Sequence, residues 1–171
     1  MGDRSNNSGA FQAYDTGLAF AHAVEVLLCQ YDKGIHMLNY KDVMLSIPII
    51  VNGAFACELF LKSLLTEPSR IHLLKELFLE LGKQDNCLYD KVMQQSIFEM
   101  KKIDDGYNED IFWNDLEHIN KAFEELRYMH EPKNIPEQRY NPDFLCRFCF
   151  VLRKNCEDKY GPRPLITGPN R

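Results

Sequence analysis

The sequence of 171 residues predicts an all-α fold, an up-and-down bundle of four or five long helices with short helices between them. Apolar residues recur at three- and four-residue spacing through most of the chain. No stretch of useful length alternates apolar and polar residues as a half-buried strand does. Hydrophobic residues make up 45% of the chain and charged residues 26%, which is the balance of one globular domain with one core.

The first two helices are predicted from the N-terminal part of the chain. Residues 1–9 are small and polar, so we expect them to be disordered and the first helix to begin near Ala10. Apolar side chains in residues 10–32 recur at helical spacing, with Gly17 as the weak point. Residues 42–66 are apolar on nearly all sides, which is typical of a central helix. Polar residues interrupt this segment, so we interpret it as a core helix and not as a membrane span.

Two further helices are expected in the middle of the chain. Pro68 breaks the preceding helix, and Ser69 is a candidate N-cap for the third one. This prediction puts His72 at the start of the third helix, which Gly82 should end. A weaker helical pattern over residues 86–102 predicts a fourth helix.

The last two helices are separated by a proline-rich loop. A regular apolar stripe from residue 110 to Pro132 predicts the fifth helix. Residues 131–143 contain three prolines and should form a loop, after which a sixth helix is predicted over residues 144–160. Residues 161–171 are expected to be an irregular tail. One helical domain over residues 10–160 therefore accounts for the chain.

Charge and cysteine usage restrict the function. The net charge is −5 and the pI about 5.5, so binding to nucleic acid requires a local basic patch or a dimer groove instead of a basic surface. The six cysteines, with no recognisable signal peptide, suggest reduced thiols and a cytoplasmic protein without a membrane segment. Cys146, Cys149 and Cys156 share a face of the sixth helix, where free thiols are a better interpretation than a tetrahedral zinc site. We expect no metal and no cofactor.

Glu58 is a carboxylate in the most apolar helix, where an ionised group must be paired and hydrogen-bonded. Lys62, one turn later, is the local candidate partner, and Arg127 is the distant one. The ion pair would either orient helices or belong to a functional pocket. His72 has the same two interpretations, as a capping or packing histidine or as part of a site.

The segment FEELRYMHEP, residues 123–132, ends the predicted fifth helix with a group of polar side chains. Arg127 and His130 are three residues apart and share a helix face, and Glu131 can pair with Arg127 across four residues. Tyr128 adds a hydroxyl on a neighbouring face. RNA cleavage needs an acid or base and a cation at the phosphate, which His130 and Arg127 could supply. Pairing of Arg127 with Glu131 would instead be structural.

Three segments, FACELFLKSLL, RIHLLKELFLEL and FEELRYMHE, are similar in order and helical context to the recurrent segments of the HEPN superfamily, the helical nucleotide-binding domains of higher eukaryotes and prokaryotes. The likeness spans roughly residues 42–131. It implies a HEPN-like bundle that forms a homodimer through helices including the Arg127 region. It also implies a toxin–antitoxin, phage-defence or RNA-related role, with an antitoxin or other protein, RNA or a nucleotide as partner.

Many members of that superfamily are metal-independent ribonucleases in which an Arg is followed, after four to six residues, by a His. The corresponding positions after Arg127 hold Pro132, Lys133 and Asn134. The chain therefore resembles a divergent member that lacks the usual spacing.

Two functional hypotheses follow from the residues and the resemblance. The first is a binding or interaction module with a polar pocket or network formed by Glu58, Lys62, His72, Arg127, Tyr128 and Glu131. The second is a divergent metal-independent endoribonuclease in which Arg127 and His130 carry the chemistry.

Overall fold

The computed structural model describes residues 4–36, 44–120 and 140–163, with the side chains of 4–8 and 34–36 outside the description. The described residues form six helices and no strand, so the predicted all-α class is confirmed. The helices are α1 (Arg4–His36), α3 (Ser46–Leu64), α4 (Leu74–Gln84), α5 (Asn86–Lys101), α6 (Glu109–Ile119) and α8 (Pro142–Tyr160). Four of them are long, whereas α4 and α6 have 11 residues each.

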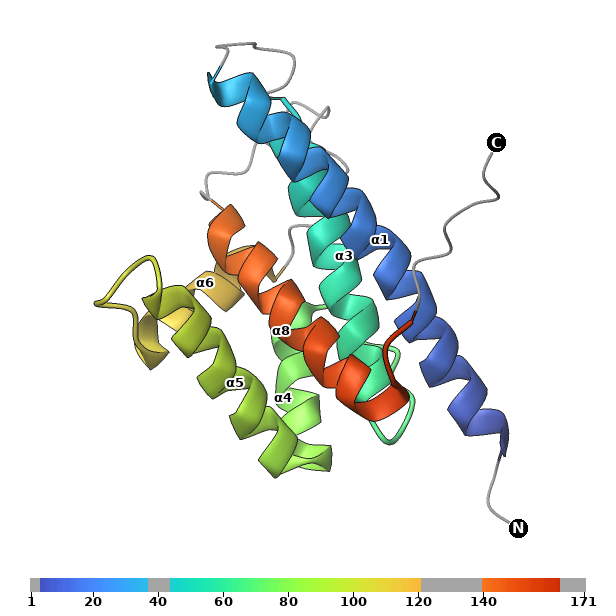
Figure 1. Cartoon of the computed structure of the whole chain (residues 1–171). Helices are drawn as coiled ribbons and strands as arrows, with labels where there is room; N and C mark the ends of the chain where they lie inside the picture. The colour runs from blue at the N-terminus through green and yellow to red at the C-terminus, as the bar shows by residue number, and fades with distance from the viewer. Residues whose placement is uncertain (1–3, 37–43, 121–139, 164–171) are drawn as a thin grey trace, which may run out of the picture.

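Helix α3 is the central helix, as predicted. It lies between α1 and α8 and also packs against α4 (Figure 1). Its buried side chains point to several sides, and Phe60 and Leu61 are fully buried. Pro48 stands in the first turn of α3, where its missing N–H would have no helical partner.

Among the described helices, α3 alone has the length and apolar composition that could cross a membrane. The sequence-based argument that polar residues exclude such a segment was therefore too strict. Inside the bundle, 61% of the apolar window is buried against other helices. That burial is the property of a core helix.

Helix α1 lies along α3, and the two helices approach closely at Gly17. A Cβ atom added there would lie 2.8 Å from Cε1 of Phe60, a distance that real Cβ atoms do not show. The residue predicted as the weak point of the first helix is thus the position that lets two helices meet. The helix begins at Arg4 and not near Ala10, so residues 4–9, expected to be disordered, are helical. Extending an existing helix is much less costly than nucleating one.

Helix α4 begins later than predicted, because its N-terminus is capped by another helix. The side chain of Asn120, at the end of α6, accepts a hydrogen bond from the backbone N–H of Lys75 (2.8 Å). Ser69 does not cap α4: its hydroxyl accepts a hydrogen bond from the N–H of Ile71. His72 therefore lies before α4, in an extended segment, and not at a helix start.

Gly82 does not end α4, which continues to Gln84. The Gln84 side-chain oxygen accepts hydrogen bonds from the N–H groups of Thr66 (2.9 Å) and Glu67 (3.0 Å). These bonds satisfy the backbone of the loop that follows α3. The last residue of α4 is thus tied to the loop after α3, and Asp85, which follows it, is already the N-cap of α5.

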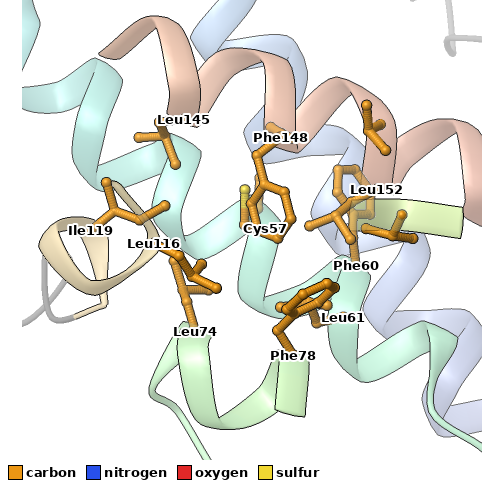
Figure 2. Close-up of a cluster of buried hydrophobic side chains, with 14 of the residues drawn as sticks. Cys57, Phe60, Leu61, Leu74, Phe78, Leu116, Ile119, Leu145, Phe148 and Leu152 are labelled. Carbon is orange, nitrogen blue, oxygen red and sulfur yellow. The ribbon is translucent and has the colours of Figure 1, made fainter. Parts of the chain in front are cut away.

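The centre of the core lies where α3, α4, α6 and α8 meet (Figure 2), and buried side chains of α1 and α5 extend it. Cys57 and Phe60 of α3 lie opposite Phe148 of α8, with Phe78 of α4 and Leu116 of α6 closing the other side. Phe78 and Phe148 pack edge to face, with ring centroids 5.9 Å apart. Burial of each such side chain contributes roughly 1.5–3 kcal/mol, so this contact region is the main source of stability.

The fourth and sixth helices agree with prediction as α5 and α8. Asp85 caps α5 by accepting from the N–H of Leu88 (2.9 Å), and Asn141 caps α8 by accepting from the N–H of Phe144 (3.1 Å). Helix α6 starts at Glu109, close to the predicted start of the fifth helix. The helix ends at Ile119, with Asn120 as its C-cap, so the predicted continuous helix to Pro132 is interrupted there. Residues 121–132 lie outside the described residues.

Candidate functional site

Glu58, Lys62 and His72 meet at one carboxylate oxygen, and we call them the Glu58 cluster. Oε1 of Glu58 lies 2.9 Å from Nζ of Lys62 and 2.9 Å from Nδ1 of His72. The Lys62 ammonium lies 3.4 Å from the same ring nitrogen. The predicted local pairing of Glu58 with Lys62 is therefore present, and His72 joins it from a second segment.

The cluster leads from the core to the surface. The exposed fraction of the side chain is 5% for Glu58, 19% for Lys62 and 67% for His72. Glu58 and Lys62 lie one turn apart on α3, in the order that favours an ion pair on a helix. The buried carboxylate is thus held from within the bundle, while the imidazole remains accessible to solvent.

His72 reaches Glu58 because both ends of the segment that carries it are fixed. The hydroxyl of Ser69 accepts from the N–H of Ile71 (3.2 Å), which closes a turn before His72. On the other side, the bond from Lys75 to Asn120 fixes the first turn of α4. Of the interpretations left open for His72, capping is excluded, because α4 begins two residues later.

Nδ1 of His72 has two partners in the cluster. It lies 2.9 Å from Oε1 of Glu58 and 3.4 Å from Nζ of Lys62, so it donates to the carboxylate in one tautomer and accepts from the ammonium in the other. Both contacts use Nδ1, so Nε2 is the ring nitrogen that the cluster does not engage.

A pocket of about 250 Å³ adjoins the cluster through Lys62. Small residues of α1 make room for it, and the end of α3 with the following loop forms the opposite wall. Its lining consists of Gly9, Ala10, Ala13, Lys62, Leu65, Thr66, Pro68 and Ser69. Three residues of this lining, Lys62, Thr66 and Ser69, have polar side chains, which are suited to an anionic or hydrogen-bonding group.

The wall of this pocket at the end of α3 is anchored by α8. The ammonium of Lys159 donates to the carbonyl oxygens of Ser63 (3.0 Å) and Leu64 (3.1 Å), which belong to the last turn of α3. Burial lowers the pKa of Lys159. The hydroxyl of Tyr160 also donates to the Ser63 carbonyl. These bonds hold the end of α3 in place, and with it the start of the loop that follows.

Four predicted site residues, Arg127, Tyr128, His130 and Glu131, lie outside the described residues. Asn120 is the last described residue before them. Its bond to Lys75 brings this end of α6 to the start of α4, three residues along the chain from His72.

A second polar group, which sequence reasoning missed, joins α6 to α8. Oδ2 of Asp115 accepts hydrogen bonds from the hydroxyl of Tyr107 (2.9 Å) and from the side-chain amide of Asn141 (2.9 Å). Burial raises the pKa of Asp115. The two hydrogen bonds lower that pKa, but the effect of burial is larger. Burial also raises the pKa of Tyr107. These partners are eight and 26 residues from Asp115, so no local pattern reveals them.

The cysteines are all free, and those on α8 are buried or half-buried, as predicted for Cys146, Cys149 and Cys156. Burial raises the pKa of Cys146 and of Cys156 to about 12. Both thiols are protonated at neutral pH and are poor nucleophiles or metal ligands. Within the described ranges, no group of three or more His, Cys, Asp or Glu side chains is arranged to hold a metal ion.

Comparison of the chain with protein-family models, with curated proteins and with solved structures gives no match. Functional inference therefore depends on the residues and geometry of the chain itself.

Proposed function

We propose that this chain is a HEPN-like helical binding module that receives RNA or a nucleotide at the Glu58 cluster. The observation that carries the proposal is the position of Lys62. Its ammonium touches the buried carboxylate of Glu58, and the same residue also lines the neighbouring pocket. An ammonium has three N–H donors, and the contact with Glu58 uses one of them. A phosphate oxygen in the pocket can accept another.

The polar groups around Lys62 support a phosphate-bearing ligand. Thr66 and Ser69 line the same pocket, and His72 lies on the solvent side of the cluster. A volume of about 250 Å³ is below the usual 300–1,000 Å³ of a site that encloses a whole small molecule. The pocket would therefore hold one phosphate group while the rest of the ligand lies across the surface.

The acidic composition is compatible with such a site. With a net charge of −5, the chain has no excess of cations for broad contact with a phosphate backbone. Binding through one built cluster requires few phosphate contacts. We therefore expect affinity for RNA to depend only weakly on salt concentration.

Binding of a fluorescent single-stranded RNA and of a fluorescent adenine nucleotide, measured by anisotropy, tests the proposal. Lys62→Met keeps the apolar stem and removes the charge. We expect it to weaken binding about tenfold or more, since hydrogen bonds to charged groups are the stronger ones. Lys83→Met is the matched control, because Lys83 is 74% exposed and pairs only with Glu80 among its described contacts. Equal affinities for both variants and the wild type would contradict the proposal.

His72→Gln provides a second variant for the binding test, since an exposed side chain can be changed with little effect on folding. Circular dichroism of each variant checks the helical content. A loss of binding counts for the proposal only in a variant that keeps the wild-type spectrum.

The proposed biological setting is a toxin–antitoxin or phage-defence system, with a homodimer and an antitoxin or other protein partner. This part of the proposal rests on the resemblance of the sequence alone. The alternative, a divergent metal-independent endoribonuclease that uses Arg127 and His130, concerns residues outside the described ranges and stays a prediction. Light scattering coupled to size-exclusion chromatography measures the oligomeric state directly.

A further inference from the structure

Helices α5 and α8 lie side by side and run in opposite directions (Figure 1). Three pairs of residues join them at successive levels, which are Lys91 with Asp158 (2.9 Å), Gln95 with Asn155 (2.8 Å) and the backbone carbonyl of Glu99 with Arg147 (3.0 Å). These pairs fix the register of the two helices. The level of any other residue along the contact therefore follows from its spacing to them.

Two phenylalanine side chains are exposed along this contact. Phe98 is 63% exposed, more than any other large apolar side chain in the described residues, and Phe150 is 45% exposed. Phe98 is three residues from Gln95, which bonds to α8, so it lies on the side of α5 next to α8. Phe150 is likewise three residues from Arg147, which bonds to α5. The register puts the two rings at about the same level, where they form an apolar patch.

The surroundings of these two rings are basic. Residues 94–102 and 146–154, about one turn to either side of the rings, contain one acidic side chain, Glu99, and five cationic ones, Lys101, Lys102, Arg147, Arg153 and Lys154. The chain as a whole has a net charge of −5, so this local excess is opposite in sign. Lys101 and Lys154 are exposed, and neither forms an ion pair with a described carboxylate. We call the α5–α8 face the surface formed by Phe98, Lys101, Lys102, Arg147, Phe150 and Lys154.

Each phenylalanine of the α5–α8 face has a lysine one helical turn later. Nζ of Lys102 lies 5.0 Å from the ring centroid of Phe98. Nζ of Lys154 lies 5.1 Å from the ring centroid of Phe150. An apolar ring and a cation are therefore presented together at two neighbouring places. A chemically matched partner brings apolar side chains to the rings and carboxylates to the ammonium groups.

We propose that the α5–α8 face binds an acidic amphipathic helix of another protein. A helix that packs along the contact between α5 and α8 places apolar residues, three and four positions apart, against Phe98 and Phe150. Asp or Glu side chains at its borders reach Lys101 and Lys154, whose charges have no described partner. This inference does not rest on the proposed function, because none of these residues belongs to the Glu58 cluster or lines its pocket.

The charges and the ring contacts disfavour two other occupants. A base that stacks on these rings would compete with the lysine that already lies over each of them. A second copy of this chain, related by a two-fold axis, would bring the same basic surface. Two such surfaces repel each other, because like charges across an interface are unfavourable.

Selection from a displayed library of random peptides, each about 16 residues or four helical turns long, tests the proposal with the full chain as the target. We expect the enriched peptides to combine apolar residues at three- and four-residue spacing with several Asp or Glu residues. A library that yields no enriched peptide, or peptides rich in Lys and Arg, overturns the proposal.

The affinity of the most enriched peptide, labelled with a fluorophore and measured by anisotropy, locates the contact. Phe98→Ser/Phe150→Ser should weaken binding about tenfold or more, since a few central anchors carry most of the affinity of an interface. Val26→Ser/Leu79→Ser is the matched control, because it removes two exposed apolar side chains from α1 and α4. Circular dichroism checks that both variants are folded. Equal affinities in the two double variants overturn the proposal.

Charge reversal tests the acidic character of the partner. Lys101→Glu/Lys154→Glu should weaken binding of the peptide at low salt, and the difference from the wild type should shrink as the salt concentration rises. Lys33→Glu/Lys83→Glu changes the net charge by the same amount at exposed positions outside the α5–α8 face, and should bind nearly as the wild type does. Equal effects of the two variants would show that the net charge attracts the peptide, and would overturn the proposal.

Two further measurements decide between the occupants. Binding of a labelled single-stranded RNA that is lost in Phe98→Ser/Phe150→Ser, while that variant keeps its affinity for the peptide, would assign the surface to nucleic acid. Light scattering that gives a dimer for the wild type and a monomer for the variant would assign it to a second copy of the chain. Either result overturns the proposal.

Discussion

Asn120 and Lys75 are joined by a hydrogen bond of 2.8 Å, in which the side chain that follows α6 caps the first turn of α4. The two residues are 45 positions apart. This cap defines the start of α4, and with it the position of the segment that holds His72 against Glu58. The Glu58 cluster therefore depends on a residue that touches none of its members among the described contacts.

Asn120→Ala should lower the free energy of unfolding by about 1 kcal/mol, the usual effect of losing an N-terminal cap. Urea denaturation followed by circular dichroism measures this change. Asn114→Ala, an exposed position on the same helix, is the control and should have little effect. If the two variants were equally stable, the cap would not be what sets the start of α4.

Gly17→Ala should destabilise the protein although alanine favours helix. The new Cβ would lie 2.8 Å from the fully buried ring of Phe60, and overpacking of this kind costs about 1–3 kcal/mol. The helix propensity of alanine offsets at most about 1 kcal/mol of this. The melting temperature reports the balance.

Gly9→Ala is the matched control for that variant. It lies on the same helix, and an added Cβ would meet nothing within 4 Å. We expect its melting temperature to be equal to or higher than that of the wild type. A higher melting temperature in Gly17→Ala than in the wild type would contradict this prediction. It would mean that α1 and α3 make room for the added methyl group without loss of stability.

Loss of the Asp115 proton should lower the free energy of unfolding as the pH rises from mildly acidic values. Burial raises the pKa of Asp115 above 3.8, so the folded state holds this proton to higher pH than the unfolded state does. The stability that the protonated form contributes is fully present below about pH 4 and is lost as pH rises through the folded pKa.

Asp115→Asn removes that titration and keeps an oxygen that can accept from Tyr107. Between pH 4 and pH 7, the urea midpoint of the wild type should fall relative to that of the variant. Parallel pH profiles would show that Asp115 has the same pKa in both states, contrary to the effect of its burial.

Lys159→Met should destabilise the protein by about 1–3 kcal/mol, because it leaves the last carbonyl groups of α3 without their charged donor. Lys154→Met tests the effect of an exposed lysine on the same helix, which lies over the ring of Phe150. Guanidinium denaturation compares the two variants. Similar midpoints would indicate that solvent satisfies these carbonyls as well as Lys159 does.

The helices of the core could be predicted from the sequence because their own side chains specify them. The apolar character of α3 on several sides predicted a central helix, and the pattern of α8 predicted its limits closely. The predictions were wrong where a helix boundary involves a residue that is distant in sequence. Ser69 looked like the cap of α4, but Asn120 provides that cap. Gly82 looked like the end of α4, but the helix continues to Gln84, which is bonded to the loop after α3.

The candidate site was partly predictable for the same reason. Glu58 and Lys62 are one helical turn apart, so their ion pair follows from local spacing. The approach of His72 to Glu58 depends on the path of the chain between α3 and α4, and single-sequence rules for helix ends placed His72 in a helix. The group formed by Tyr107, Asp115 and Asn141 spans 34 positions and has no sequence signal.

The covering of α3 by α8 has a consequence for synthesis of the chain. The hydroxyl of Tyr14 donates to the carbonyl of Gly161, at a separation of 147 residues, so α1 and the end of α8 (Figure 1) are joined only after residue 161 has been made. Until α8 has left the ribosome, the apolar face of α3 around Cys57 is not covered by α8. The nascent chain is therefore more prone to aggregation before α8 is made than after α8 has packed on α3.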